Sequence, residues 1–325
     1  MINIKVTGTG SYLPKNVITN DDLSKVVDTN DEWIKTRTGI KERRISQGED
    51  TITMATNAAK EALKDSNLDS KDIDLIIVAT LTPDNFMPST ACSVQNNIGA
   101  LNAMCFDISA ACSGFIYGLE VASSLLKSSN RKRALVIGAE TLSKILNWED
   151  RGTCVLFGDG AGACVIEKGD KGIEAFHTHS IGEKGDNLTC GAYDVQNPYV
   201  SIKNEVNEKY IKMNGREIFK FAVKSISDTV GELIKKTSWE LDDVKYIVPH
   251  QANVRVIDYT AKKLNIDNDK FYTNLDKYGN TSAASIAIAL DEMNKKKLLN
   301  KGDKIILVGF GGGLTYGGAA LCWNV

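Results

Sequence analysis

The sequence predicts an α/β protein in which central sheets are covered by helices on both faces. Short, continuous apolar runs recur along the chain, at residues 75–80, 104–109, 134–138, 164–167, 246–248 and 305–308. Between them lie amphipathic segments with the periodicity of helices, at residues 51–65, 114–127, 218–236 and 254–264. Strands that are apolar along their whole length and are separated by helices are typical of sheets buried on both faces.

The two halves of the chain resemble each other weakly. In each half a helical segment precedes a short apolar run (51–80 and 218–248). RALVIGAE followed by FGDGAGACVIE likewise parallels KIILVGF followed by GGGLTYGGAALCW. We expect two copies of one α/β unit, an N-terminal half at 1–170 and a C-terminal half within 171–325, joined by the polar stretch 168–212. The matching segments are short, so chance similarity remains the alternative.

Composition and charge limit the classes of function. The 325 residues are 42% hydrophobic and 25% charged, and the formal net charge is −2. Nucleic-acid binding through bulk positive charge is therefore not expected. No apolar run approaches the roughly 20 residues that span a bilayer, so no membrane segment is expected. The N-terminal segment MINIKVTGTGSYLP lacks the features of a signal peptide and is expected to form a first strand.

The seven cysteines indicate a reducing compartment. Their number is odd, their spacing shows no pairs, and the sequence contains no CxxC motif. This pattern fits thiols in the cytoplasm better than disulfides or a zinc cluster. We therefore expect a cytoplasmic protein without a metal.

Cys112 is the candidate nucleophile. It lies in AACSG, after the apolar run MCFDIS and before the helical segment at 114–127, and is expected at a turn between a strand end and a helix start. Unpaired backbone N–H groups and the helix dipole stabilise a thiolate at such a position. Most free cysteines are buried and structural, and we prefer that interpretation for Cys92, Cys164 and Cys322, which lie in apolar runs.

Of the three histidines, His250 is placed best to assist a cysteine. It ends the apolar run YIVPH and precedes a helical segment, so its position matches that of Cys112 in the other half. Strand ends of this kind converge on ligand sites in α/β sheets; a core or surface histidine is the alternative. His177 and His179 lie two residues apart in a polar stretch. Without a third ligand, an exposed pair is a better interpretation than a metal site.

Asn280 is a candidate polar partner. It lies in YGNTS, a turn before a helix of small residues. Such an asparagine is most often a turn or cap residue, and otherwise an amide donor to an oxyanion or enolate. Two glycine-rich stretches do not support NAD or ATP. Residues 158–163 lead into an apolar run rather than a helix, and 311–313 lack a P-loop lysine, so close backbone approach or N–H donation to an acyl oxygen is expected there.

The segments ACSGF (111–115), HQAN (250–253) and GNTSAAS (279–285) are similar to those of 3-oxoacyl-[acyl-carrier-protein] synthase III. The resemblance spans the whole chain, from GTGSYLP near the N-terminus to GFGGGLTYGGA near the C-terminus. The order and spacing of the cysteine, histidine and asparagine motifs make it specific. It implies a thiolase-like fold of two duplicated α/β halves in a layered αβαβα arrangement.

The resemblance also implies the activity of the initiating condensing enzyme of type II fatty-acid synthesis. Cys112 would take an acyl group from acyl-CoA, with acetyl as the default, and malonyl-[acyl-carrier protein] would then bind. His250 and Asn280 would hold its thioester carbonyl while decarboxylation generates an enolate that attacks the acyl-Cys112. Backbone N–H groups of Cys112 and residues 309–313 would form the oxyanion hole. Neutral donors stabilise the enolate in this scheme, so we expect no cofactor; acyl-CoA is a substrate.

The resemblance further implies substrate contacts. The residues that match CoA-binding positions of the family are Trp33, Arg37, Arg151, Met213, Gly215, Phe219 and Asn253. Those that match its docking site for the acidic carrier protein are Arg255, Lys262 and Lys263. Asp258 lies on the same helical stripe, so a merely solvated face is the alternative. Met87 stands where many members carry phenylalanine, at the end of an acyl pocket that the partner subunit of a homodimer supplies. Primer length and branching are therefore left open.

Other functions also stay open. A condensing enzyme of polyketide or alkylquinolone type would share the fold and the nucleophile. A hydroxymethylglutaryl-CoA synthase would in addition need a glutamate near the cysteine, for which the sequence offers no convincing candidate. A cysteine acyl-thioester hydrolase would direct water to the acyl-enzyme and would leave the matches at Asn280 and at the CoA contacts unexplained. A non-catalytic acyl-CoA-binding protein would not need Cys112.

Overall fold

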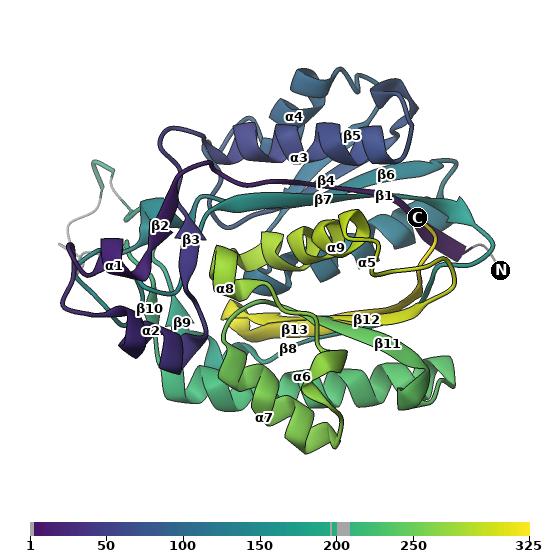
Figure 1. Ribbon diagram of the computed structural model, residues 1–325. Helices are drawn as coiled ribbons and strands as arrows, with labels where there is room; N and C mark the ends of the chain where they lie inside the picture. Colours follow the sequence, from purple (N-terminus) through teal and green to yellow (C-terminus); the bar gives the residue numbers. More distant parts are fainter. Residues whose placement is uncertain (1–2, 196, 200–208) are drawn as a thin grey trace.

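The computed structural model describes residues 3–195, 197–199 and 209–325, and Figure 1 shows its helices and sheets in layers. The strands are β1 (Asn3–Tyr12), β2 (Val17–Thr19), β3 (Glu42–Arg44), β4 (Leu75–Ala79), β5 (Met104–Ile108), β6 (Arg133–Glu140), β7 (Gly160–Gly169), β8 (Ile173–Ser180), β9 (Leu188–Thr189), β10 (Lys212–Met213), β11 (Val244–Pro249), β12 (Lys304–Gly311) and β13 (Thr315–Cys322). The α-helices are α1 (Asn20–Leu23), α2 (Asp31–Thr38), α3 (Thr51–Asp65), α4 (Thr90–Ile98), α5 (Gly114–Ser128), α6 (Gly215–Thr237), α7 (Val254–Leu264), α8 (Leu275–Tyr278) and α9 (Ser285–Lys295).

Five layers alternate between helix and sheet (Figure 1). Helices α3 and α4 cover the outer face of the layer that contains β1, β7, β6, β4 and β5. Helices α5 and α9 lie between this layer and a second one, which contains β8, β13, β12 and β11 and is covered on its outer face by α6 and α7. This is the layered α/β arrangement that the sequence predicts.

Hydrogen bonds join the main strands in the order β11-β12-β13-β8-β1-β7-β6-β4-β5. The two layers meet where β1 pairs with β8 through Ile4 and Ile173. In the first layer β4 runs parallel to both β5 and β6, and in the second layer β11 runs parallel to β12. Parallel pairing brings the carboxyl ends of these strands to one edge of each layer, and the turns that follow them position the candidate site.

Burial explains why these segments occupy the central layers. Strand β4 (LIIVA) is buried along its whole length, as expected for a strand covered on both faces. Helix α9 buries eight of its eleven residues, whereas α7, which covers an outer face, buries four of eleven. A helix between two sheets must be apolar around most of its circumference, so the small and aliphatic residues of α9 suit this place.

The polar stretch predicted as a connection contains a strand of the main sheet. Residues 173–180 form β8, which pairs with β13 along its length and with β1 at one residue. The stretch 168–212, which the sequence predicts to join two halves, thus includes a strand, and the half-exposed surroundings of β8 accommodate its polar side chains. His177 and His179 lie on β8, with their ring centres 6.2 and 5.6 Å from that of Tyr316.

Candidate active site

One cavity brings the three candidate catalytic residues together. It has a volume of about 1290 Å³, and Cys112, His250 and Asn280 all contribute to its lining. The turn after β5 supplies Cys112, the turn after β11 supplies His250, and the segment between α8 and α9 supplies Asn280. The two sheet layers thus present their strand ends to a common space.

Cys112 lies on a sharp turn between β5 and α5. Ala111, just before it, has a φ of 44°, in the left-handed region that favours glycine. Cys112 is 7% exposed, and burial raises the pKa of its thiol to about 12. Desolvation thus opposes the thiolate that is predicted from the sequence at this helix start. A proton must leave the sulfur before it can attack.

The end of β12 packs directly against the nucleophile. A Cβ atom added at Gly311 would lie 2.8 Å from both the Cβ and the N atom of Cys112, closer than real Cβ contacts. Gly309 approaches the next residue in the same way, since its added Cβ would lie 3.1 Å from Cα of Ser113. This is the close backbone approach expected of the glycine-rich segment, and it places main-chain groups of β12 beside the sulfur-bearing residue.

His250 is buried and held by one side-chain contact. Its Nδ1 atom lies 2.7 Å from Oγ of Ser285, at the start of α9. Burial lowers the pKa of the imidazole to about 3, so the ring is neutral at physiological pH. The Phe310 ring packs edge-on against the imidazole, with 5.1 Å between the ring centres. The site therefore contains a fixed, uncharged imidazole.

Asn280 is anchored so that its nitrogen remains available. Its main-chain N–H donates to the carbonyl of Leu156 at 2.8 Å, and its own carbonyl accepts from Gly158 at 3.0 Å. Its side-chain Oδ1 accepts the N–H of Ser282 at 2.8 Å, which is a local turn contact. Within the described ranges no protein group accepts from the side-chain Nδ2. The turn interpretation is thus correct for the oxygen, and two N–H donors are left for a ligand.

Six of the seven residues that match CoA-binding positions line the same cavity: Trp33, Arg37, Met213, Gly215, Phe219 and Asn253. Arg151 does not, although its guanidinium lies 5.1 Å from the centre of the Trp33 ring. The Nη1 atom of Arg151 donates to the carbonyl of Asp28 at 3.0 Å. An aromatic base stacked between two groups needs about 7 Å, or two contact distances. A base therefore fits between Trp33 and Arg151 only after the arginine moves.

The proposed carrier-protein contacts lie on α7. Arg255 lines the cavity, and Lys262 and Lys263 are exposed on the last turn. The carboxylate of Asp258, which dilutes this charge, accepts from Nδ2 of Asn268 at 2.7 Å. Met87 is 84% exposed and is not among the residues that line the cavity of its own chain.

Comparison with known proteins identifies the family. A family model described as 3-Oxoacyl-[acyl-carrier-protein (ACP)] synthase III matches residues 106–183, and the model of the C terminal of that synthase matches residues 234–323. The chain is 68% identical, over the full length of both proteins, to a beta-ketoacyl-[acyl-carrier-protein] synthase III of Clostridium botulinum strain Okra. The chain belongs to the 3-oxoacyl-[acyl-carrier-protein] synthase III family.

Solved structures related to this synthase III chain share its fold. The 3-oxoacyl-[acyl-carrier-protein] synthase III of Aquifex aeolicus VF5 is 50% identical with a TM-score of 0.92, covering 99% of this chain and 100% of that one. The priming beta-ketosynthase of the R1128 polyketide pathway is 33% identical with the same TM-score, covering 98% and 96%. The predicted thiolase-like fold class is confirmed. So is the predicted activity class, an acyltransferase that acts as the initiating condensing enzyme of fatty-acid synthesis.

Three polar residues of this synthase III site were missed by sequence reasoning. Ser285 contacts His250, and Ser282 and Glu140 both influence the pKa of Cys112. The sequence offered no convincing glutamate near the cysteine, and the structure supplies Glu140 as a candidate. Because β4 pairs in parallel with both β5 and β6, Glu140 at the end of β6 lies near the turn after β5. A carboxylate that ends the buried strand RALVIGAE was the available signal.

The described part of the chain contains no cluster of three or more His, Cys, Asp or Glu side chains that could hold a metal ion. A helix long and apolar enough to cross a membrane is likewise absent from the described residues. The groups that line the synthase III cavity are neutral donors, the cysteines Cys112 and Cys190, apolar side chains and a few cations.

Proposed function

We propose that this chain transfers an acyl group from acyl-CoA to Cys112 and condenses it with malonyl-[acyl-carrier protein], giving 3-oxoacyl-[acyl-carrier protein], CO2 and CoA. The observation that carries the proposal is the shared cavity. A buried thiol, a neutral imidazole and an amide with free N–H groups line the same space, at Cys112, His250 and Asn280. These are the groups needed to carry an acyl chain and to stabilise an enolate without a metal or other cofactor.

In the first half-reaction the sulfur of Cys112 attacks the thioester carbon of acyl-CoA. A carbon–sulfur bond forms at Cys112, and the bond to CoA breaks. Negative charge develops on the carbonyl oxygen, and backbone N–H groups of Cys112 and of residues 309–313 are its proposed donors. The contact of Gly311 with Cys112 supports this assignment, because the two main-chain segments are adjacent.

In the second half-reaction His250 and Asn280 hold the thioester carbonyl of the malonyl group. Loss of CO2 leaves an enolate, whose oxygen receives hydrogen bonds from both residues and whose carbon attacks the acyl group on Cys112. The low pKa of His250 suits this role, because a neutral imidazole donates a hydrogen bond without delivering its proton to the enolate. A charged imidazolium would instead protonate the enolate at carbon, and the enolate could then no longer attack the acyl group.

The substrate arms have their own proposed contacts. Trp33 and Arg37 would bind the nucleotide part of CoA, and Arg151 would cover the base after leaving its present contact with Asp28. The pantetheine would lie along Met213, Gly215, Phe219 and Asn253, which also line the cavity. The acidic carrier protein would dock on Arg255, Lys262 and Lys263 of α7.

We further propose that the protein is a cytoplasmic homodimer and that each chain consists of two duplicated halves. Strand β5 is an edge strand of the sheet, and Leu101 and Met104 beside it are 75% and 43% exposed. Phe86 and Met87 are 77% and 84% exposed. A second copy would cover this apolar surface and would receive Met87 at the end of its acyl pocket. The passage between layers from Gly169 to Ile173 supports a boundary between halves at 170/171.

Intact-mass analysis tests the proposed function. Acetyl-CoA is added first, and malonyl-[acyl-carrier protein] is then added while CO2 and acetoacetyl-[acyl-carrier protein] are assayed. We expect an acetyl adduct on the wild type and on the control Cys92→Ala, whose thiol lies outside the cavity, but none on Cys112→Ala. An equal adduct on Cys112→Ala contradicts the proposal. Loss of the adduct to water alone indicates a hydrolase, and an adduct without condensation indicates another extender.

A further inference from the structure

Glu140 is a buried acid that the two half-reactions leave without a role. It ends β6 and is fully buried. Its Oε2 atom accepts the hydroxyl of Thr82 at 2.6 Å and that of Thr80 at 3.2 Å. The N–H of Leu81 contacts Oε2 at 3.2 Å and Oε1 at 3.3 Å. Among the described residues Oε1 thus has a single, long contact, and it is the oxygen better placed to take a proton. Burial raises the pKa of this carboxyl group to about 7.

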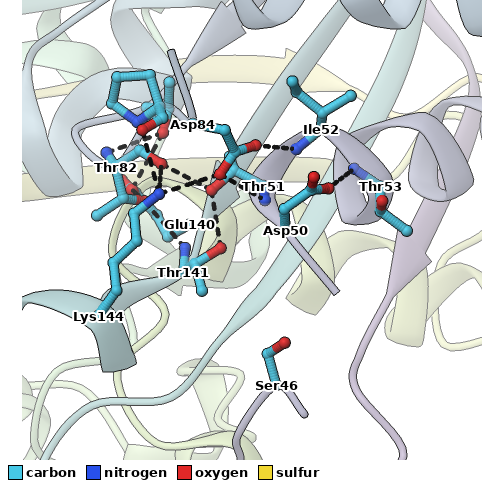
Figure 2. A network of polar contacts seen from close by, with 12 residues as sticks. Ser46, Asp50, Thr51, Ile52, Thr53, Thr82, Asp84, Glu140, Thr141 and Lys144 are labelled. Atoms are coloured by element: carbon cyan, nitrogen blue, oxygen red, sulfur yellow. Dashed lines mark hydrogen bonds and ion pairs between the residues drawn. The ribbon is translucent and has the colours of Figure 1, made fainter. Parts of the chain in front are cut away.

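The network around Glu140 fixes its position (Figure 2). The hydroxyl of Thr82 accepts the N–H of Thr141 at 2.9 Å, and the carbonyl of Thr82 accepts from Lys144 at 2.7 Å. Lys144 in turn pairs with Asp84 at 3.1 Å, so these two charges compensate each other. These contacts hold the carboxylate of Glu140 in one orientation.

On β7, Cys164 and Glu167 pair with Val136 and Arg133, away from Glu140. The ionisable groups nearer to Glu140 are Asp159, before β7, and Cys112, in the turn after β5. Asp159 precedes Gly160, the residue that pairs with Glu140 in β7, but its carboxylate accepts from Ser46 and Ser143 instead. Cys112 is close enough for the charge of Glu140 to contribute to the raised pKa of its thiol.

Ser282 connects Glu140 with Cys112. The Ser282 hydroxyl acts to lower the pKa of both the Cys112 thiol and the Glu140 carboxyl group, against the larger effect of burial. Ser282 is 1% exposed and lines the cavity, yet its Oγ atom has no hydrogen-bond partner of normal geometry within the described residues. Its φ is 47°, a second strained position beside Cys112. A buried hydroxyl without a partner is destabilising, so its place beside the nucleophile needs an explanation. Such contacts tighten when substrate binds.

The thiol needs a base, and His250 is poorly suited. Burial lowers the pKa of His250 to about 3, and Ser285 occupies its Nδ1. Glu140 has a pKa near physiological pH, where a general base works best.

We propose that the thiol proton of Cys112 passes through the Ser282 hydroxyl to Glu140 when acyl-CoA binds, and that Glu140 keeps it while the acyl group occupies the sulfur. The inference rests on the proposed role of Cys112 as acyl carrier. Ser282 takes the proton from Sγ and gives its own to Glu140, and the sulfur electron pair forms the bond to the acyl carbon. CoA leaves as a thiolate and takes a proton from water. When the enolate displaces Cys112, the proton returns to sulfur along the same path.

Single-turnover acylation across pH 5 to 9 tests this path, with the acetyl adduct measured by intact mass after rapid quenching. In the wild type we expect the rate to rise to a plateau with an inflection near pH 7, where Glu140 ionises. In Ser282→Ala and Glu140→Gln we expect a rate roughly 10²-fold lower at pH 7.5. The inflection should also be lost, and the rate should keep rising as the thiol itself ionises.

Thr51→Val is the matched control. Its hydroxyl donates to the carbonyl of Thr82 at 2.7 Å, so the change disturbs the network without touching Glu140 or Ser282; it should keep the inflection. Ser282→Ala decides the case alone if Glu140→Gln does not fold, because it removes an unpartnered hydroxyl. Wild-type rates and inflection in Ser282→Ala overturn the proton path while the adduct itself still forms. Absence of any adduct on the wild type overturns the proposed function and with it this inference.

Discussion

The hydroxyl of Ser285 lies 2.7 Å from Nδ1 of His250, and this contact determines which ring nitrogen is available to a substrate. The same hydroxyl oxygen lies 3.5 Å from the N–H of Gln251, which donates to it. The proposed donation to a carbonyl or enolate oxygen requires the ring proton on Nε2, and Ser285 satisfies Nδ1 when its hydroxyl donates there.

Replacing Ser285 with alanine should slow decarboxylation and leave acylation unchanged. Without the hydroxyl, the imidazole loses a hydrogen bond that fixes its tautomer and orientation. We expect decarboxylation to become about tenfold slower. The measurement is CO2 release from malonyl-[acyl-carrier protein], compared with acetyl-adduct formation on the same protein. Ser227→Ala, which removes a hydroxyl bonded within α6, is the control. Equal slowing of both half-reactions would show that Ser285 acts on the fold rather than on His250.

Replacing Asn280 with aspartate should abolish enolate stabilisation with little change in shape. The carboxylate still accepts the N–H of Ser282 through one oxygen, but the other oxygen replaces the NH2 donor and repels the enolate. We expect decarboxylation to fall roughly 10²- to 10³-fold, the usual loss for an oxyanion donor. The assay is again CO2 release, with the amount of acetyl adduct as the internal reference. Unchanged CO2 release would exclude Asn280 from the enolate site.

Replacing Gly311 with alanine should impair acylation at Cys112. The added methyl group would lie 2.8 Å from Cβ and N of Cys112, so the nucleophile must shift. We expect at least a tenfold slower adduct formation, because small displacements of a reacting group are costly. Gly231→Ala on α6 is the matched control, since its Cβ would meet nothing within 4 Å. That change should keep the rate and stabilise the helix by about 0.5–1 kcal/mol. Equal rates in both variants would contradict a tight contact at Gly311.

The location of the site was predictable from the sequence, but the protonation states of the groups inside it were not. Both Cys112 and His250 follow apolar runs that end before helices, and such strand ends meet at one edge of a sheet. The protonation state of Cys112 depends instead on desolvation, which involves residues from the other layer such as Gly311. No local pattern contains that information.

The fold itself was predicted where periodicity was strong and missed where burial was partial. Helices α3 and α7 have the predicted bounds, because their apolar stripes are regular. Strand β8 was taken for a connection, because its alternation is weak and its partners β1 and β13 are distant in the sequence. Glu140 was missed for the same reason: its proximity to Cys112 arises from the pairing of β4 with two strands.

Acid should destabilise the protein through His250. The pKa of this histidine is about 3 when folded and near 6.5 when exposed. Below pH 6.5 the unfolded chain therefore binds a proton that the folded chain does not, and stability falls as pH drops toward 3. Glu140 has the opposite sign, because its raised pKa makes stability fall as pH rises from 4.5 to 7. We would measure the free energy of unfolding in urea at pH 7 and at pH 4. The contribution of His250 should lower it by on the order of 3 kcal/mol in the wild type at pH 4, and His250→Gln should not show this loss. Parallel curves for wild type and variant would contradict the buried neutral imidazole.

Replacing Trp33 with alanine should weaken CoA binding without affecting the chemistry. Trp33 lines the cavity, and the centre of its ring lies 4.6 Å from the Arg37 guanidinium. Loss of a stacking surface for the adenine costs about 1–3 kcal/mol, so the KM for acetyl-CoA should rise roughly 10- to 100-fold while kcat is unchanged. S-acetyl-pantetheine, which has no adenine, is the substrate control and should react equally with wild type and variant. A parallel loss with the shortened substrate would mean that Trp33 supports the cavity wall rather than the base, because only an effect confined to the nucleotide identifies a stacking contact.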